Sequence, residues 1–183
     1  MSDDTTSGNG GQPAAPQGAP AAQQPRFQVL AQYVRDFSFE NAAAQKGLNT
    51  TDVQPEIQVA ISLDARKRAT PNHFEVISKY KVTSKNRVNG DVLFMVELDY
   101  GAAVVVEGVP EDQLHPFLTI EVPRLTFPFV RRIIADATHD GGFPALNIDM
   151  VDFVALYRQE LARRSQQAGV TPGGPGAGTV RPN

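Results

Sequence analysis

Cysteine is absent from all 183 residues, and this absence excludes disulfide bonds, thiol catalysis and zinc sites with cysteine ligands. Basic residues are not in excess either: 17 lysines and arginines against 20 acidic residues give a net charge of −3, which does not favour nucleic-acid binding. No apolar run approaches the roughly 20 residues that cross a bilayer. The opening MSDDTTSGNGG lacks the basic and apolar regions of a secretory signal. These absences predict a cytoplasmic protein that binds no nucleic acid and does not insert into the membrane.

Groups that carry out catalysis are also sparse. The three histidines, His73, His115 and His139, are scattered, and no two of them have metal-ligand spacing. His139 follows an apolar helical stripe and is explained more simply as a partner for the last carbonyls of that helix. The sequence has neither a nucleophile elbow nor a phosphate-binding loop, and we interpret Gly141-Gly142 as a connector. We therefore predict no enzyme, no cofactor and no metal site.

The two ends of the chain differ in composition from its middle. Residues 1–25 consist largely of Gly, Pro, Ala, Gln and Ser, and residues 166–183 include the stretch TPGGPGAGTVRPN. Segments of this kind bury too little apolar surface to fold. We predict disorder for both ends and one folded domain from 26 to 165, a length at which a single core can form.

Four segments of this domain alternate between apolar and polar residues with period two: 27–40, 53–64, 74–83 and 92–106. Each has one apolar and one mostly polar face, which indicates an antiparallel sheet that is packed on one side only. Arg35 interrupts the first alternation and predicts a bulge or a strand end. The pair Asn89-Gly90 predicts a hairpin between the last two segments.

Helical patterns follow the fourth strand. A short acidic start at Glu111 is interrupted by Pro116. Pro128 suits the first turn of a long helix, and Gly141-Gly142 can end that helix with a positive φ. These signals predict a short helix followed by a long one.

A second long helix is predicted near the end of the domain, with Asp149 as its N-cap and Asp152 in its first turn. Its apolar stripe comprises Met150, Phe153, Val154, Tyr157 and Leu161. The order of elements predicts an α+β fold, in which two long helices and a short one pack on one face of a four-stranded antiparallel sheet.

The face of the sheet that is predicted to meet water mixes apolar and acidic residues. The apolar ones are Val34, Ile77, Leu93 and Met95, and the acidic ones are Asp36, Glu40, Glu97 and Asp99. A few exposed apolar residues are ordinary, but a Met or Leu ringed by carboxylates also suits a docking patch for a basic, partly apolar partner. The sequence leaves both interpretations open. One sheet cannot cover two long helices, so we also predict burial against a second subunit across a two-fold axis.

Several motifs, in this order, resemble SecB, the cytosolic export chaperone of bacteria. They cover about Phe27 to Arg163 and comprise DFSFE at 36–40, QPEI at 54–57, FMVE at 94–97, Phe127-Pro128, GFPALNI at 142–148, Phe153 and Leu156-Tyr157. The resemblance implies a SecB-like sheet with helices on one face, and a homotetramer assembled as a dimer of dimers.

For function, the resemblance implies ATP-independent holding of unfolded secretory precursor proteins and their delivery to SecA, the motor of the Sec translocase. The SecA-docking positions of the family fall here on Asp36, Glu40, Met95 and Glu97. All four lie on the polar face that the alternation predicts. The SecA segment concerned is small, basic and zinc-carrying, so the zinc would belong to the partner.

The resemblance also implies long apolar grooves for clients, near the helices. Candidate groove residues are Phe117, Leu118, Ile120, Leu125, Phe127, Phe143 and Tyr157, and core packing explains each of them equally well. An alternative function keeps the fold and changes the client range: a SecB-like chaperone dedicated to one client, such as a toxin–antitoxin system.

Overall fold

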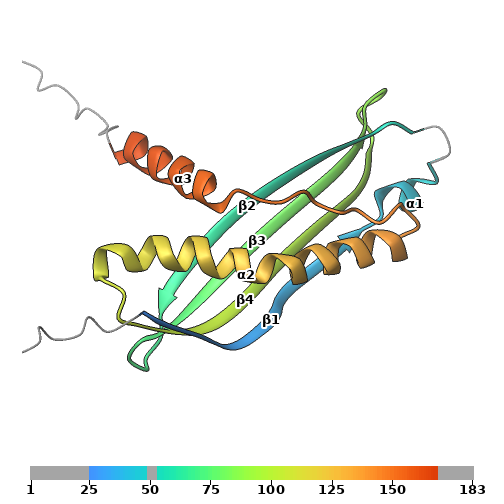
Figure 1. Ribbon diagram of the computed structural model, residues 1–183. Helices are drawn as coiled ribbons and strands as arrows, with labels where there is room; N and C mark the ends of the chain where they lie inside the picture. The colour runs from blue at the N-terminus through green and yellow to red at the C-terminus, as the bar shows by residue number, and fades with distance from the viewer. Residues whose placement is uncertain (1–24, 49–52, 169–183) are drawn as a thin grey trace, which may run out of the picture.

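Four antiparallel strands form one sheet in the computed structural model, which describes residues 25–48 and 53–168 (Figure 1). Their order across the sheet is β1-β4-β3-β2. The elements are β1 (Arg26–Glu40), α1 (Ala42–Lys46), β2 (Pro55–Lys67), β3 (His73–Asn86), β4 (Val92–Glu107), α2 (Glu111–Asp140) and α3 (Phe153–Ala168). Both long helices lie on the same face of the sheet (Figure 1), and the predicted α+β fold class is confirmed. Most of the two ends for which disorder is predicted, 1–24 and 169–183, lie outside the described residues; α3 continues to Ala168, past the predicted boundary at 165.

The core lies between the sheet and the two long helices. Its centre is aromatic: the ring of Phe127 on α2 lies 6.3 Å from that of Tyr80 on β3 and 6.0 Å from that of Phe153 on α3. A second cluster fills the space under the first half of α2, and its members are Phe74, Val76, Ala102, Val104, Val106, Leu118 and Val122. The helices are therefore fixed to the sheet by apolar burial, which is the dominant favourable contribution to folding.

Helix α2 differs from the prediction. It runs unbroken for 30 residues through Pro116, Pro123 and Pro128, where we expected a short helix and a separate long one. An interior proline costs about 3 kcal/mol because it removes a hydrogen bond and crowds the preceding turn. Against this, α2 buries large apolar side chains along its whole length, each contributing roughly 1.5–3 kcal/mol; these are Leu118, Val122, Phe127, Val130 and Ile134. Packing on the sheet therefore outweighs the local cost of the prolines.

Helix α3 begins three residues later than predicted. Asp152, and not Asp149, is its N-cap: the Asp152 carboxylate accepts a hydrogen bond of 2.9 Å from the backbone N–H of Ala155. Residues 144–152 are extended, so that Ile148 and Phe153 both reach the same core cluster. Met150 is consequently 79% exposed and does not belong to the apolar stripe of the helix.

Three bulges change which side chains share a face. The pairing of β1 with β4 shifts between Val34 and Asp36, which confirms the predicted bulge at Arg35, and shifts again between Val29 and Ala31. Cross-strand partners in an antiparallel sheet share a face. Tyr33 therefore lies with Gly101 on the outer face, away from the helices, and Val34 lies with Tyr100 on the helix side. The alternation along 27–40 predicts Tyr33 on the apolar face and Val34 on the polar face, so both placements reverse the prediction.

The third bulge lies on β4, where Ser84 pairs with Phe94 but Lys85 pairs with Val92. Leu93 falls between these pairs, and its side chain enters the core with 1% exposure. The prediction that Leu93 meets water is therefore wrong. Ile77 does lie on the outer face, in the same row as Gly101, but it is buried as well. Of the four apolar residues expected on that face, Met95 alone remains there and partly exposed.

Candidate functional site

The outer face of the sheet brings the four predicted docking residues together. In the register of β1 with β4, Glu40 is opposite Met95 and Asp36 is opposite Asp99, with Glu97 in the row between them. Directly opposed Cβ atoms are about 4.5–5.5 Å apart, so Asp36, Glu40, Met95 and Glu97 form one contiguous patch on two neighbouring strands. We call this set the docking patch. The helices α2 and α3 lie on the other side of the sheet (Figure 1).

Lysines on β3 border the docking patch on one side. Lys81 Nζ lies 2.5 Å from Glu97 Oε1, and Lys79 Nζ lies 2.7 Å from Asp99 Oδ2. The hydrogen bond to Glu97 raises the pKa of Lys81, so its charge is maintained. Within the described part of the chain, Asp36 and Glu40 take part in no ion pair. The patch therefore keeps a net negative charge on its β1 side, and Asp36 opposite Asp99 is a like-charge pair that a cationic partner would relieve.

A hydrogen-bonded cluster occupies the other end of the outer face. Tyr33 donates its hydroxyl hydrogen to Glu75 Oε1, and Arg66 donates to Glu75 Oε2. The Tyr33 ring reaches Glu75 by passing over Gly101, whose missing side chain leaves the space for it. The cluster joins all four strands and rigidifies the sheet that carries the docking patch. Sequence alternation missed it, because the two bulges in β1 decide on which face Tyr33 lies.

Gly101→Ala is expected to destabilise the fold. The new Cβ would lie 2.5 Å from a ring carbon of Tyr33, so the ring must leave Gly101 and its hydrogen bond to Glu75. Overpacking of this kind costs about 1–3 kcal/mol, measured as the free energy of unfolding in urea. In a Tyr33→Ala background the same substitution should cost much less, because the clashing ring is gone; an equal cost in both backgrounds would contradict the contact.

Glu75 is expected to make stability depend on pH. The hydrogen bond from Tyr33, followed by the contacts of Arg66, holds the pKa of Glu75 below its ordinary value of 4.5. A carboxylate with a lowered folded pKa stabilises the fold above its unfolded pKa, and this stabilisation is lost as the pH falls through the folded value. Glu75→Gln should therefore be less stable than the parent at about pH 7, and the difference should shrink below about pH 4.5. Urea unfolding across this range measures it; a difference that is independent of pH would refute the assignment.

The helix side carries the candidate groove residues, but the structure does not gather them into one surface. Leu118 and Phe127 are buried in the core, so in this chain neither side chain is open to a client. Phe117 packs on Phe27, and Phe143 packs on Phe94 with 4.8 Å between ring centroids. Ile120 is half-buried against the core, and Leu125 is exposed on α2.

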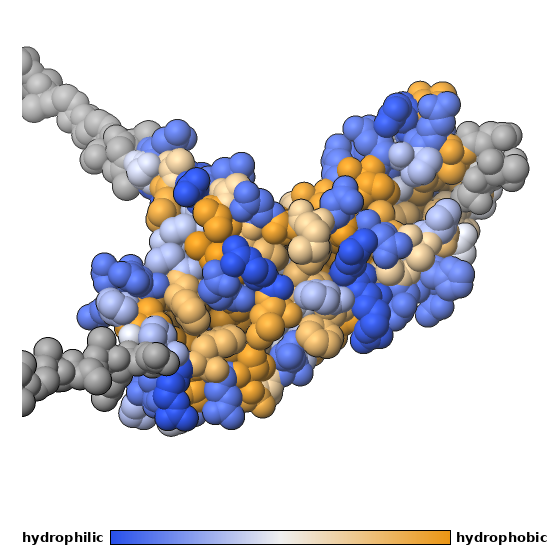
Figure 2. All heavy atoms as spheres, viewed as in Figure 1, coloured by the Kyte–Doolittle hydropathy of each residue, from blue (hydrophilic) through white to orange (hydrophobic). Residues whose placement is uncertain are grey.

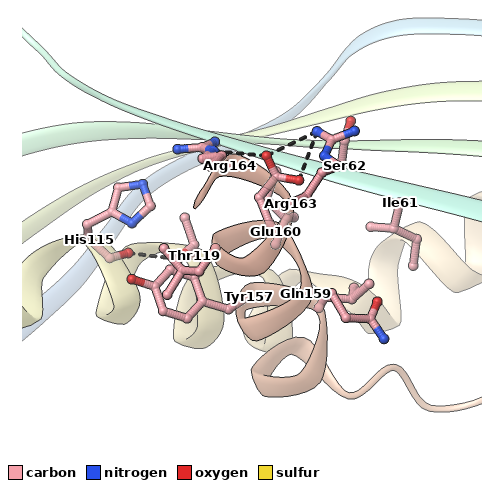
Figure 3. Close-up of a pocket in the computed structure, with 12 residues that line it drawn as sticks. Ile61, Ser62, His115, Thr119, Tyr157, Gln159, Glu160, Arg163 and Arg164 are labelled. Carbon is pink, nitrogen blue, oxygen red and sulfur yellow. Dashed lines mark hydrogen bonds and ion pairs between the residues drawn. The ribbon is translucent and has the colours of Figure 1, made fainter. Parts of the chain in front are cut away.

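The remaining candidate, Tyr157, lines a pocket of about 390 Å³ between β2, α2 and α3 (Figure 3). Its apolar lining also includes four residues that we did not predict as groove residues: Ile61, Leu63, Leu156 and Leu161. The sequence did show that these residues belong to the apolar faces of a strand and a helix. It could not show that the two faces line one pocket, because this depends on where α3 packs against the sheet. On the polar side of the pocket, Glu160 pairs with both Arg163 and Arg164 (Figure 3). The hydrogen bond from Arg164, followed by that from Arg163, lowers the pKa of Glu160.

Apolar surface extends beyond this pocket. Figure 2 shows hydrophobic side chains gathered over α2 and the strands beside it. Exposed members of this side include Val34 and Phe37 on β1, Val59 on β2, and Leu125 and Phe129 on α2. In residues 25–48 and 53–168 no group of acidic, histidine or cysteine side chains could hold a metal ion. None of the described helices is long and apolar enough to cross a membrane.

Comparison with known proteins bears directly on this two-sided sheet. The chain matches the family described as "Preprotein translocase subunit SecB" over residues 20–164. The chain belongs to the SecB family. The protein-export protein SecB of Cereibacter sphaeroides is 68% identical over 152 residues, which cover 81% of this chain and 92% of the relative. That of Paracoccus denitrificans is 61% identical over 167 residues, covering 91% and 94%.

A solved structure shares the fold at lower identity. It is the SecB-like chaperone of Mycobacterium tuberculosis, in complex with a peptide from an antitoxin; it is 14% identical, covers 69% of this chain and 91% of its own, and superposes with a TM-score of 0.57. The SecB family is a family of protein-export chaperones, so the chain is a chaperone of protein transport in the Sec pathway.

Proposed function

We propose that this SecB-family chain holds unfolded secretory precursor proteins without ATP and delivers them to SecA. The observation that carries the proposal is the division of one sheet between two surfaces. The outer face presents the docking patch, with three carboxylates and one methionine, and the helix side presents the apolar pocket and its surroundings. A client and SecA would therefore bind opposite faces at the same time.

The helix side suits clients that are recognised by hydrophobicity alone. Ile61, Leu63, Leu156, Tyr157 and Leu161 offer a pocket wall without a charged side chain. Beside this wall Glu160 pairs with both Arg163 and Arg164, so its negative charge offsets one of the two positive charges. Apolar contacts of this kind are non-directional, and several shallow sites on one client give avidity without sequence readout.

Delivery to SecA rests on charge complementarity at the docking patch. A basic segment of SecA would find Asp36, Glu40 and Glu97 within two neighbouring strands, and Met95 between them would accept an apolar side chain. Complementary charge raises the rate of encounter and suppresses wrong partners. The zinc of this SecA segment would need no ligand from the chaperone.

Assembly as a homotetramer is part of the proposal. Leu125 and Phe129 lie one turn apart on α2 and are 47% and 45% exposed, although each is large and apolar. The α2 helix of a second copy, related by a two-fold axis, would pair with this helix and cover both side chains. A cytoplasmic location follows from the proposed role, because precursors and SecA meet there.

Suppression of aggregation tests the holding function. Urea-unfolded secretory precursors are diluted into buffer with and without the purified chaperone, in the absence of ATP, and light scattering is followed. We expect suppression of most precursors at a stoichiometry near one tetramer per client. Suppression of a single client would favour a dedicated chaperone, such as one of a toxin–antitoxin system. No suppression of any client would overturn the proposal.

A further inference from the structure

Lys81 occupies a special position beside the docking patch. On the outer face, the middle row of the patch reads Ser38, Glu97, Lys81 across β1, β4 and β3. Lys81 Nζ lies 2.5 Å from Glu97 Oε1, so this patch carboxylate is held by a lysine of the same chain. Glu40 also acts on Lys81 through its charge. A cation of SecA that approaches Glu97 therefore meets a carboxylate whose charge Lys81 already offsets.

The ion pair between Lys81 and Glu97 can be replaced by one between Glu97 and a cation of the partner. Both side chains are well exposed, at 58% and 56%, so either can leave the contact into water without a desolvation penalty. Exposed pairs of this kind contribute only about 0.2–1 kcal/mol. Lys81 approaches from the β3 side, and the β1 side of Glu97, next to Ser38, stays open. A partner can thus bind Glu97 from β1 while Lys81 withdraws.

The neighbouring pair provides a contrast. Lys79 also makes a short contact with Asp99, at 2.7 Å, but the Asp99 side chain is only 20% exposed and lies outside the docking patch. The positive charge of Lys79 also offsets the repulsion between Asp99 and Asp36, which lie opposite each other on β4 and β1. The two lysines share strand, face and charge, and they differ in the carboxylate that each one holds.

From this geometry we propose that Lys81 is an internal competitor for the partner's cation at Glu97 and thereby sets the affinity and selectivity of the docking patch. The proposal rests on the proposed docking of SecA. A partner with one stray cation gains little, because it only replaces Lys81. A partner that also reaches Asp36 or Glu40 and places an apolar side chain on Met95 gains contacts that Lys81 does not make. Lys81 thus keeps SecA binding weak enough to be reversible and penalises unrelated basic proteins.

Lys81→Gln tests this competition, with Lys79→Gln as a control that removes the same charge. Titration of SecA by calorimetry at constant salt should give a Kd about two- to fivefold lower for Lys81→Gln, which is the fold-change equivalent to the loss of one exposed ion pair. Lys79→Gln should change the Kd by less than about twofold. Equal gains from both variants would overturn the proposal, because they would reflect overall charge and not competition at Glu97.

A double variant separates this inference from the docking proposal itself. In a Glu97→Gln background, Lys81→Gln should give no more gain than Lys79→Gln gives, because the contested carboxylate is gone; a full gain in that background would refute the competition. If Glu97→Lys leaves SecA binding unchanged, the docking patch is misassigned. If Glu97→Lys abolishes binding while Lys81→Gln leaves the Kd unaltered, docking stands and only the role of Lys81 is refuted. Unchanged circular dichroism and oligomeric mass exclude misfolding as the cause.

Discussion

Phe153→Ala is expected to lower the free energy of unfolding by about 3–5 kcal/mol, the range for removing a buried phenylalanine. Phe153 is 2% exposed and packs edge-on against Phe127 at 6.0 Å. It is also the first residue of α3, so its ring is the main anchor that ties this helix to the core. Since α3 forms one wall of the pocket, the variant should also suppress aggregation less well than the parent chain.

Met150→Ala is the matched control for this experiment. Met150 is large and apolar and precedes Phe153 by three residues, but it is 79% exposed, so its truncation should change stability by no more than about 0.5 kcal/mol. Unfolding should be followed in urea at one fixed protein concentration, because oligomerisation contributes to the measured stability. A loss below about 1 kcal/mol for Phe153→Ala would mean that α3 does not dock on the sheet as described.

Glu97→Lys is expected to weaken SecA binding by roughly tenfold or more. The substitution removes the central carboxylate of the docking patch and places a second cation beside Lys81, where like charges repel an approaching basic segment. Because the side chain is exposed on the outer face, the fold, the oligomer and client holding should all persist. Titration of SecA into the variant measures the change.

Glu56→Lys is the control for charge. It changes the net charge by the same amount on the same sheet, but Glu56 lies on β2, opposite Lys85 and away from the patch. Its affinity for SecA should stay within about twofold of that of the parent. If Glu97→Lys binds SecA as tightly as the parent does, Glu97 is not part of the docking patch. The same conclusion follows if Glu56→Lys loses as much affinity for SecA as Glu97→Lys does.

Sequence alternation predicted most of the sheet because most of it is regular. The alternation along β3 and the central part of β4 matches the observed faces, and the interruption at Arg35 did mark a bulge. It failed at Tyr33 and Val34, because the bulge at Leu30 has no visible interruption and puts the residues up to the next bulge on the other face. It failed at Leu93 because Leu93 is itself the extra residue of a bulge. These bulges are set by how neighbouring strands pair, which a single segment does not reveal.

The helices show where local rules yield to tertiary packing. Prolines end or kink an isolated helix, but α2 continues through Pro116, Pro123 and Pro128 because its apolar side chains are buried against the sheet along its whole length. Likewise Asp149 and Asp152 are both good N-caps, and the choice of Asp152 depends on where Phe153 enters the core.

The two candidate surfaces differ in the same way. The acidic positions of the docking patch follow from strand pairing and lie together as expected. The groove residues could not be told from core residues, because burial of Leu118 and Phe127 depends on the sheet beneath α2.

Simultaneous binding of a client and SecA tests the central claim most directly. The claim is that clients occupy the helix side and SecA occupies the outer face of one sheet. Chaperone saturated with an unfolded precursor is titrated with SecA, and the Kd is compared with that of the empty chaperone. We expect a ternary complex in which the two Kd values for SecA agree within about twofold. In Glu97→Lys the precursor should stay bound while SecA binds roughly tenfold or more weakly. If SecA instead displaces the precursor in proportion to the amount of SecA bound, both ligands share one surface, and the claim that they occupy opposite faces is wrong.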